Sequence, residues 1–276
     1  VYQLYLPGYV VLTFIMMLGF YILLRAFGLS AWLAGLGGII WAFSSYFFIL
    51  IPAGHIWKFV TLAYIPPTIA GVVLAYRKKY LLGGVITALF IALQIQSNHI
   101  QMSYYFMFVI LFFIIAYFVD AYEKKELPHF FKASAILALA AVVGVCVNIS
   151  NLYHTYEYSK ETMRGKSELK QEGPAANQTS SGLDRDYITN WSYGIGETLT
   201  LLVPNVKGGG CSTTLSQNET AMAKANPMYG NLYSQLTPYF GDQPWTAGPV
   251  YVGAFVVFLF LSLIHISEPT RRRGIS

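Results

Sequence analysis

The sequence has few charged residues, and their scarcity is uneven along the chain. Only 11% of the 276 residues are charged, against about 25% in typical soluble domains. No aspartate or glutamate precedes Asp120, and Arg25 and Lys58 are the first two charges of any kind. A water-exposed fold would need polar side chains to cover this stretch. Their absence excludes such a fold here and indicates that lipid surrounds the first half of the chain.

Several motifs of soluble and energy-coupled enzymes are also missing. The sequence has no Walker A motif, no glycine-rich dinucleotide motif, no zincin motif and no nucleophile elbow. We therefore do not expect an ATP-driven pump, a membrane zinc protease or an α/β-hydrolase. Of the two cysteines, Cys146 lies in an apolar run and Cys211 in a polar segment. Their placement argues against a disulfide, and the sequence has no Cys/His zinc spacing.

Long apolar runs dominate the sequence. Runs near 20 residues are long enough to cross about 30 Å of hydrocarbon as helices. They predict an all-α polytopic membrane protein with about seven spans, at 5–24, 31–52, 59–76, 80–97, 101–121, 133–152 and 247–264. The third run contains Pro66 and Pro67, so we expect that helix to be kinked or broken.

The basic residues predict the orientation of these spans. Up to Lys132, seven arginines and lysines fall on one set of connections, and Lys58 alone falls on the other set. The positive-inside rule places the first set in the cytoplasm and residues 153–246 outside. The predicted organisation is a six-helix membrane region at 1–152, an external loop at 153–246, and the start of a seventh span at 247–260.

The external segment is polar and rich in tyrosine, asparagine, glycine and serine. We expect residues 151–169 to continue the sixth helix out of the membrane. Residues 187–205 are amphipathic and aromatic, so we expect an interfacial helix there, with Asp184 and Asp186 as N-caps. Residues 206–245 contain three consecutive glycines and three prolines, which predicts irregular structure.

Both ends of the sequence depart from the pattern of the rest. Residues 261–271, LSLIHISEPTR, resemble the in-frame translation of a sequencing adapter, so we expect residues 261–276 to be non-native. The competing interpretation is a span followed by a basic cytoplasmic anchor. Without this tail the chain has 15 basic and 12 acidic residues, a net charge of +3 instead of +5. The chain begins at Val1 rather than methionine, so we expect its front to be missing. Because the positive-inside rule places Val1 outside, a cytoplasmic N-terminus would need an odd number of upstream spans, most simply one.

The first polar cluster on the external side is GHIWK, residues 54–58. His55 and Lys58 are three residues apart and share a helix face or turn, so together they could hold an anionic headgroup at the bilayer surface. In the alternative interpretation, Trp57 and Lys58 anchor the chain at the interface and His55 caps a helix end. The sequence favours neither interpretation.

The second cluster lies between the fourth and fifth spans, in QIQSNHIQMSYY, residues 94–105. Its amide and imidazole side chains are Gln94, Gln96, Asn98, His99 and Gln101. An unpaired polar group that faces lipid costs on the order of a few kcal/mol, so these side chains must pair or face water. A cavity lined by amides would suit sugar hydroxyls, and interhelical hydrogen bonding is the alternative.

The third cluster begins at Asn148 and ends at Arg164. Glu157, Glu161 and Arg164 fall on one helix face. Surface ion pairing is the commoner role of such a pattern, and phosphate binding by the Arg164 guanidinium is the rarer one.

The fourth cluster is DRDYITNWSYGIGE, residues 184–197. Asp184 and Asp186 form a short D-x-D pattern, for which helix capping is a commoner role than metal binding. Trp191 and Tyr193 add aromatic surface. Glu197 follows a glycine-rich turn in an apolar setting, which makes it a candidate for substrate binding.

Several segments resemble the YfhO family of bacterial membrane proteins. They are AGHIWKFVTLAYIPPTIAG (53–71), QSNHIQMSYY (96–105), NISNLYHTYEYSKETMRG (148–165), DYITNWSYGIGETLTLLVPN (186–205) and YFGDQPWTAGPVYVGA (239–254). The resemblance implies a helical bundle similar to the GT-C glycosyltransferases, in the bacterial inner membrane. It also implies transfer of a sugar from a polyprenyl-phosphate carrier to an envelope polymer or lipid on the external side.

The resemblance assigns candidate residues but no catalytic base. In GT-C enzymes the catalytic acid generally lies in the first external loop, and no acid precedes Asp120 here, so the catalytic residue is unknown. Cations of suitable type to bind the donor phosphate are His55, Lys58, His99 and Arg164. The further substrate-binding candidates are Gln101, Trp191, Tyr193 and Glu197. No cofactor, resident metal or nucleic-acid partner is expected.

Two other functions stay open. A transporter or flippase for a lipid-linked or polar substrate would share the polar clusters at helix ends and the broken third helix. A non-catalytic envelope assembly protein would use the aromatic external segment to bind a partner. An acidic residue in an external loop upstream of Val1 would favour the transferase.

Overall fold

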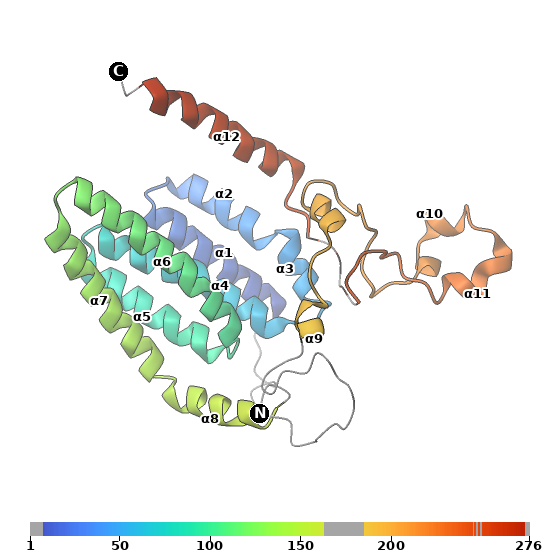
Figure 1. The fold of residues 1–276 in the computed structure, drawn as a ribbon, viewed down its shortest axis with the longest axis horizontal. Helices are drawn as coiled ribbons and strands as arrows, with labels where there is room; N and C mark the ends of the chain where they lie inside the picture. Colours follow the sequence, from blue (N-terminus) through green and yellow to red (C-terminus); the bar gives the residue numbers. More distant parts are fainter. Residues whose placement is uncertain (1–7, 163–184, 245, 247, 249, 274–276) are drawn as a thin grey trace. The chain divides into compact units, whose positions relative to one another are not determined.

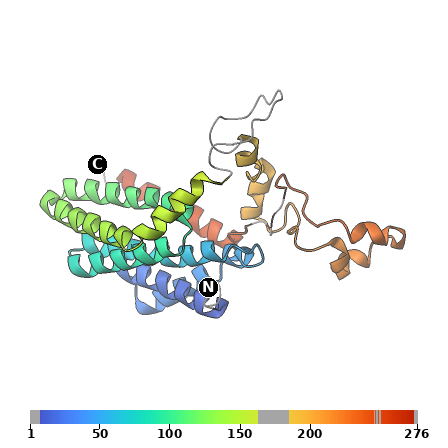
Figure 2. The same cartoon turned by 90° about the horizontal axis from the view of Figure 1, so that it is seen from below.

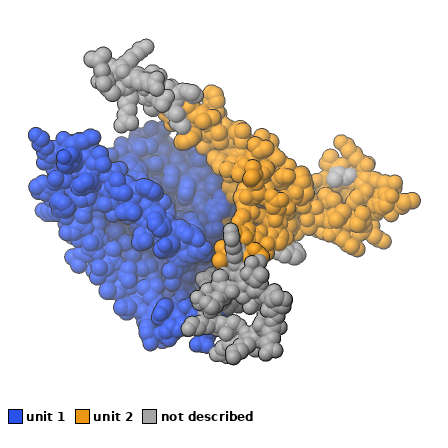
Figure 3. All heavy atoms as spheres, viewed as in Figure 1, with its two compact units in different colours: residues 1–47, 55–162 blue, residues 48–54, 163–276 orange. Residues whose placement is uncertain are grey.

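The computed structural model describes residues 8–162, 185–244, 246, 248 and 250–273. Within these residues the protein is all-helical and has no strand (Figure 1). The chain divides into two compact units (Figure 3). The first unit comprises residues 1–47 and 55–162, and the second comprises 48–54 and 163–276.

The first unit is built from long apolar helices. They are α1 (Tyr9–Ala26), α2 (Ala31–Ala42), α4 (Ile56–Tyr76), α5 (Tyr80–Gln96), α6 (Ile100–Glu123), α7 (Leu127–Cys146) and α8 (Ile149–Lys160). The short helix α3 (Ser45–Leu50) follows α2, and its residues 45–47 are assigned to the first unit and 48–50 to the second. Five candidate spans are long and apolar enough to cross a membrane: α1, α2 with α3, α4, α6 and α7. Helix α5 is also apolar but has 17 residues. Helices thus form at all of the first six predicted runs.

Two helix boundaries differ from the prediction. The run 31–52 is divided, since α2 ends at Ala42 and α3 begins at Ser45. Helix α7 ends at Cys146 and α8 begins at Ile149, so residues 151–160 do not continue the sixth helix (Figure 1). The Asn148 side chain donates hydrogen bonds to the carbonyls of Ala92, at 2.9 Å, and Gly144, at 3.3 Å. Such side-chain bonds to backbone carbonyls compete with the hydrogen bonds of a continued helix, so they favour the end of α7 at this point.

Helix α4 passes through Pro66 and Pro67 as one α-helix, so of the two predicted outcomes, a kink or a break, the break is wrong. Pro67 cannot donate to the carbonyl of Ala63. That carbonyl instead lies against Gly19 of α1, where an added Cβ would be only 2.8 Å from the Ala63 oxygen. Because 83% of the apolar stretch of α4 is buried, neighbouring helices hold it in shape where internal hydrogen bonds are missing.

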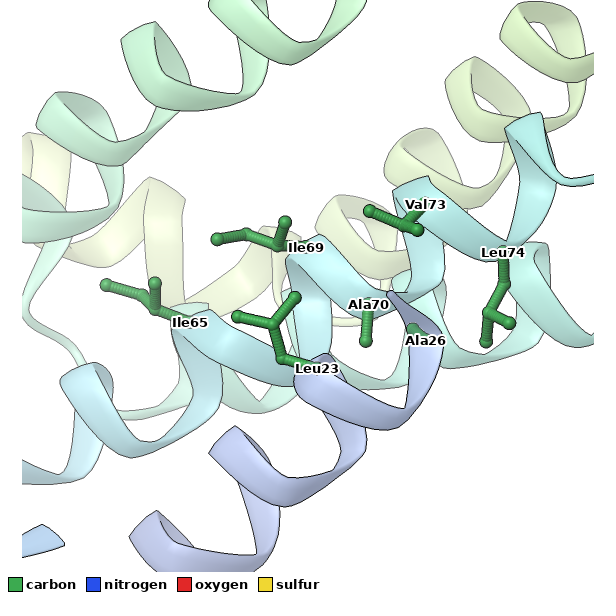
Figure 4. Close-up of a cluster of buried hydrophobic side chains, with 7 residues drawn as sticks. All are labelled: Leu23, Ala26, Ile65, Ile69, Ala70, Val73 and Leu74. Carbon is green, nitrogen blue, oxygen red and sulfur yellow. The ribbon is translucent and has the colours of Figure 1, made fainter. Parts of the chain in front are cut away.

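The core of the first unit surrounds α4, which packs against α1 and α5 (Figures 1 and 2). One buried cluster joins α1 to α4 (Figure 4), and its members are Leu23, Ala26, Ile65, Ile69, Ala70, Val73 and Leu74. Glycines bring α4 and α5 together, since a Cβ at Gly83 would lie 2.7 Å from the Gly71 carbonyl oxygen. The apolar stretch of α6 has no buried residue, which leaves room between α6 and its neighbours.

The second unit contains short helical turns and one longer helix. They are α9 (Arg185–Thr189), the 3₁₀ helices η2 (Ile195–Leu201), η3 (Leu215–Gln217) and η4 (Pro227–Tyr229), α10 (Glu219–Met222), α11 (Gly230–Tyr233) and α12 (Ala254–Arg273). The predicted seventh span is helical from Ala254, and its apolar part is Ala254–Leu263.

The predicted interfacial helix at 187–205 is wrong. Helix α9 ends at Thr189, and the next helical turn, η2, begins at Ile195. The chain between them includes Gly194, whose extended backbone starts η2. Asp186 lies in the first turn of α9 rather than before it, and Asp184 lies outside the described residues.

Candidate functional site

Three basic side chains gather at helix starts in the first unit. His55 is the N-cap residue of α4, Lys58 lies in the first turn of that helix, and His99 is the N-cap residue of α6. Burial lowers the pKa of His99 below its ordinary value of 6.5, and the nearby charges of Lys58 and His55 lower it further. We name these three residues the basic cluster. It has the charge to attract an anion at a membrane surface.

Neither histidine of the basic cluster acts as a side-chain helix cap. The side chains of His55 and His99 make no cap hydrogen bond, and the buried Nδ1 atom of His99 has no partner among the described residues. The Lys58 ammonium lies 5.3 Å from the centre of the Tyr46 ring, as in a cation–π contact. The interpretation of His55 as a helix cap is therefore not supported, because its side chain makes no cap hydrogen bond. The interpretation of Lys58 as an anchor has the contact with the Tyr46 ring in its favour.

A polar cavity of about 530 Å³ lies beside the basic cluster. Its walls come from the start of α4, the α5–α6 turn and the α7–α8 junction, and consist of Trp57, Gln96, Asn98, Val147, Asn148, Ser150 and Asn151. Trp57 directly precedes Lys58 and Asn98 directly precedes His99, so the cavity and the basic cluster share two chain segments. The lining combines neutral amides with one indole ring, a surface suited to hydroxyl-rich ligands.

An apolar cavity of about 520 Å³ lies between α4, α5, α6 and α7. Its lining is largely aliphatic and aromatic and includes Ile91, Ile95, Ile100, Met107, Ile110 and Leu137. Gln94, which also lines it, is buried and joins three helices. Its amide oxygen lies 3.4 Å from the Thr68 hydroxyl, and its amide nitrogen donates to the Ser103 hydroxyl at 3.1 Å. Gln94 therefore joins neighbouring helices by hydrogen bonds, whereas Gln96 and Asn98 line the polar cavity.

Two other predicted residues are not part of these cavities. The Gln101 amide is exposed and donates to the Tyr105 hydroxyl of its own helix at 3.1 Å. Arg164 lies outside the described residues. In the same predicted cluster, Glu157 forms an exposed ion pair with Lys160 at 2.8 Å. Such a pair contributes little to stability.

Glu197 is the most buried charged residue in the second unit among those described, with 3% of its surface exposed. The Gly194 backbone N–H donates to one carboxylate oxygen at 2.7 Å, and the Tyr239 hydroxyl donates to the other. The first bond closes the start of η2, and the second ties it to the chain 42 residues later. These two donors give Glu197 a structural role, and they hold its carboxylate in one orientation.

Tyr239 links this carboxylate to the rest of the unit. Its hydroxyl accepts a hydrogen bond from the Gln243 backbone N–H at 2.9 Å. Burial, followed by the hydrogen bond to Glu197, raises the pKa of Tyr239 to about 12, so the phenol remains protonated near neutral pH. The Gln243 side chain in turn donates to the Trp191 carbonyl at 2.9 Å.

A second carboxylate lies close to Glu197. A Cβ at Gly194 would be 1.9 Å from the Asp242 Oδ2 atom and 3.0 Å from the Glu197 Oε2 atom, so only glycine fits there. The sequence interpretation missed Tyr239, Asp242 and Gln243 as neighbours of Glu197. The segment YFGDQPW was one of those that carry the family resemblance, and this was the signal that could have found them.

The two predicted aromatic residues of this unit are half-exposed. Trp191 is 46% exposed and Tyr193 is 40% exposed, so both rings have surface available to a ligand. The Tyr193 hydroxyl accepts from the Val250 backbone N–H at 3.1 Å. Within the described parts of the chain, no three His, Cys, Asp or Glu side chains gather into a metal-ion site. Cys146 and Cys211 are free thiols.

Comparisons of the chain with protein-family models, with curated proteins and with solved structures find no match. The family resemblance and the activity it implies therefore stay predictions from the sequence.

Proposed function

We propose that this protein transfers a sugar from a polyprenyl-phosphate donor to an envelope polymer or lipid, on the external side of a bacterial inner membrane. One observation carries the proposal. The α5–α6 turn contributes to the polar cavity through Gln96 and Asn98, to the basic cluster through His99, and to the apolar cavity through Ile95 and Ile100. These surfaces match the sugar, the phosphate and the hydrocarbon chain of such a donor.

The apolar cavity accounts for the hydrocarbon part of the donor. Its volume of about 520 Å³ falls within the range of about 300–1,000 Å³ typical of ligand pockets. The residues that line it come from predicted spans, so a lipid chain could enter without exposing itself to water.

The basic cluster accounts for the phosphate. Glycosyl transfer from this donor leaves a phosphate anion, so cations placed beside it stabilise the charge that develops in the transition state. Lys58 supplies an ammonium group with three N–H donors. Burial and the basic neighbours of His99 lower its pKa, and a bound phosphate would favour its protonated form.

The polar cavity accounts for the sugar. Its amide side chains, Gln96, Asn98, Asn148 and Asn151, offer both donors and acceptors to hydroxyl groups. Trp57, in the same lining, offers an aromatic face. No catalytic base is assigned, because none of the described residues that line this cavity is acidic.

The test is binding of polyprenyl monophosphate to the purified whole protein in lipid nanodiscs, followed by sugar transfer. We expect Lys58→Gln and His99→Gln to weaken binding about tenfold each, as loss of a charge-assisted hydrogen bond would. Lys160→Gln is the matched control, because it removes an exposed cation that pairs only with Glu157 among described carboxylates. Equal affinities of all three variants would contradict the assignment of the basic cluster.

Transfer itself is measured with a radiolabelled polyprenyl-phosphate hexose added to proteoliposomes. Release of polyprenyl monophosphate with loss of label from the carrier supports a transferase. A flippase is the second candidate, because the apolar cavity also includes Tyr76 and Ser134, near the opposite ends of the helices from Gln94. Movement of the intact labelled donor to the other leaflet, without cleavage, would favour the flippase and refute the transferase.

A further inference from the structure

A second polar pocket lies at the other ends of the same helices, away from the basic cluster. Its volume is about 430 Å³. It is formed where α4 and α6 end and α7 begins, and its lining is Tyr76, Arg77, Lys78, Tyr117, Asp120, Ala121, Lys124, Glu126, His129 and Phe130. We name it the Arg77 pocket. The proposed transferase has no use for it.

The charges of the Arg77 pocket leave one cation in excess. Lys78 pairs with Glu126 at 2.9 Å, and Lys124 pairs with Asp120 at 2.8 Å. The Arg77 guanidinium forms no ion pair with a carboxylate among the described residues. It lies beside the Tyr117 hydroxyl instead. A guanidinium has five N–H donors, so most of its capacity stays available for a ligand.

The wall of the pocket is fixed before any ligand binds. His129 Nε2 donates to the Tyr76 carbonyl at 2.8 Å, because a carbonyl can only accept, and His129 Nδ1 is hydrogen-bonded to the Tyr80 hydroxyl at 2.7 Å. The Tyr76 ring stacks on Tyr117 with 4.5 Å between ring centres. The Tyr76 hydroxyl bonds to that of Ser134 at 2.9 Å. A pocket with rigid walls loses little entropy on binding.

The surroundings indicate the class of ligand. The pocket lies at the ends of apolar helices, where the headgroups of a bilayer would be, and basic pockets between membrane helices bind anionic headgroups. The planar fork of a guanidinium matches two phosphate oxygens. The start of α7, a helix of 20 residues, adds partial positive charge from its unpaired N–H groups. Lys125 and Lys132 add further positive charge in the adjoining sequence.

We propose that the Arg77 pocket binds the phosphate group of an anionic phospholipid. The carboxylates of Asp120 and Glu126 keep their lysine partners, and the Arg77 guanidinium takes two phosphate oxygens. By the positive-inside prediction this surface faces the cytoplasm, so the ligand is distinct from the proposed external sugar donor. The proposal depends on neither the transferase activity nor the identity of its substrate.

The experiment measures dissociation constants for the whole purified protein in neutral detergent. The probes are short-chain phosphatidylglycerol, short-chain phosphatidylcholine and inorganic phosphate. We expect phosphatidylglycerol to bind about tenfold more tightly than phosphatidylcholine, and Arg77→Gln to remove that preference. Lys79→Gln is the matched control, because Lys79 carries the same charge in the same loop but does not line the pocket. We expect it to change affinity by less than about twofold.

Two further variants guard against misfolding and non-specific charge effects. Arg77→Lys keeps the charge but loses the fork, and we expect an affinity between those of the native protein and Arg77→Gln. If Arg77→Gln does not fold, Lys124→Gln tests the same pocket, and we expect it to weaken phosphatidylglycerol binding. Loss of binding by the pocket variants, with Lys79→Gln unaffected, supports the proposal.

Competition with inorganic phosphate separates the two sources of the phosphate group. Failure of millimolar phosphate to displace phosphatidylglycerol identifies a lipid headgroup as the ligand. Displacement identifies a site for soluble phosphate and overturns the lipid assignment. Equal losses in Arg77→Gln and Lys79→Gln, or equal affinities for the two lipids, would show that general surface charge accounts for binding and would overturn the pocket itself.

Discussion

The close approach of α4 and α5 makes the substitution Gly83→Ala a sharp test of the fold. A Cβ at Gly83 would lie 2.5 Å from the Ala75 backbone nitrogen, about 0.9 Å inside an ordinary contact of 3.4 Å. It would also lie 2.7 Å from the Gly71 carbonyl oxygen. Both neighbours are backbone atoms of the central helix, so no side-chain rotation can relieve the overlap. Overpacking of this kind costs about 1–3 kcal/mol.

Gly35→Ala provides the matched control. Gly35 lies inside α2, and a Cβ there would have nothing within 4 Å. Both substitutions gain the same helix propensity, about 0.8–1.0 kcal/mol for alanine over glycine, so the difference between them isolates the overlap. Each kcal/mol corresponds to about 2–4 °C in Tm for a protein of this size. Thermal unfolding in detergent should therefore give Gly83→Ala the lower Tm, and values within about 1 °C would refute the packing of α4 on α5.

Three further predictions concern the two units and the apolar cavity. Tyr239→Phe removes one of the two donors to the Glu197 carboxylate and should destabilise the second unit by about 1–3 kcal/mol. Limited proteolysis should then cut the Tyr239→Phe variant faster than the control variant Tyr229→Phe, since the Tyr229 side chain is 50% exposed. Equal rates would contradict the role of the Tyr239 hydroxyl. Because folding lowers the pKa of His99, the unfolded chain takes up its proton first. The free energy of unfolding should fall as the pH drops from about 7 through 6.5 and below, and His99→Gln should show a shallower fall in unfolding measured between pH 8 and 5. An unchanged slope in that variant would assign the effect to other groups. Ala141→Phe should fill part of the apolar cavity and weaken polyprenyl-phosphate binding about tenfold, whereas Ala135→Phe, on the exposed side of the same helix, should not. Equal binding by these two variants would show that the cavity does not hold the lipid chain.

The helices of the first unit were predictable because the signal for each is local. A run of about 20 apolar residues is visible in the sequence without reference to any other part of the chain. The runs at 59–76 and 101–121 accordingly reappear as α4 and α6 with shifts of a few residues. The same reasoning failed at 187–205. The amphipathic pattern there was local too, but Glu197 bonds to Tyr239, and no pattern within a short window records that partner.

The sequence predicted which residue types make up the candidate site, but not the structural role of each residue. The sequence grouped Gln94, Gln96, Asn98 and Gln101 as one polar cluster. The structure assigns Gln94 to interhelical hydrogen bonds, Gln96 and Asn98 to a cavity, and Gln101 to a bond along its own helix. Side-chain direction on a helix end changes with each residue, so neighbours in sequence face different surroundings.

The sequence by itself determined that this protein is helical and apolar enough for a membrane. That conclusion depends only on how many charges the chain has and where they fall. The tertiary structure decided the rest: whether α4 stays one helix through two prolines, where α7 ends, and which described cations form no ion pair with a carboxylate. Each of these depends on a partner far away in the chain, such as Gly19 for the Ala63 carbonyl or Ala92 for Asn148. The free energy of such a contact exists only once both segments are folded together.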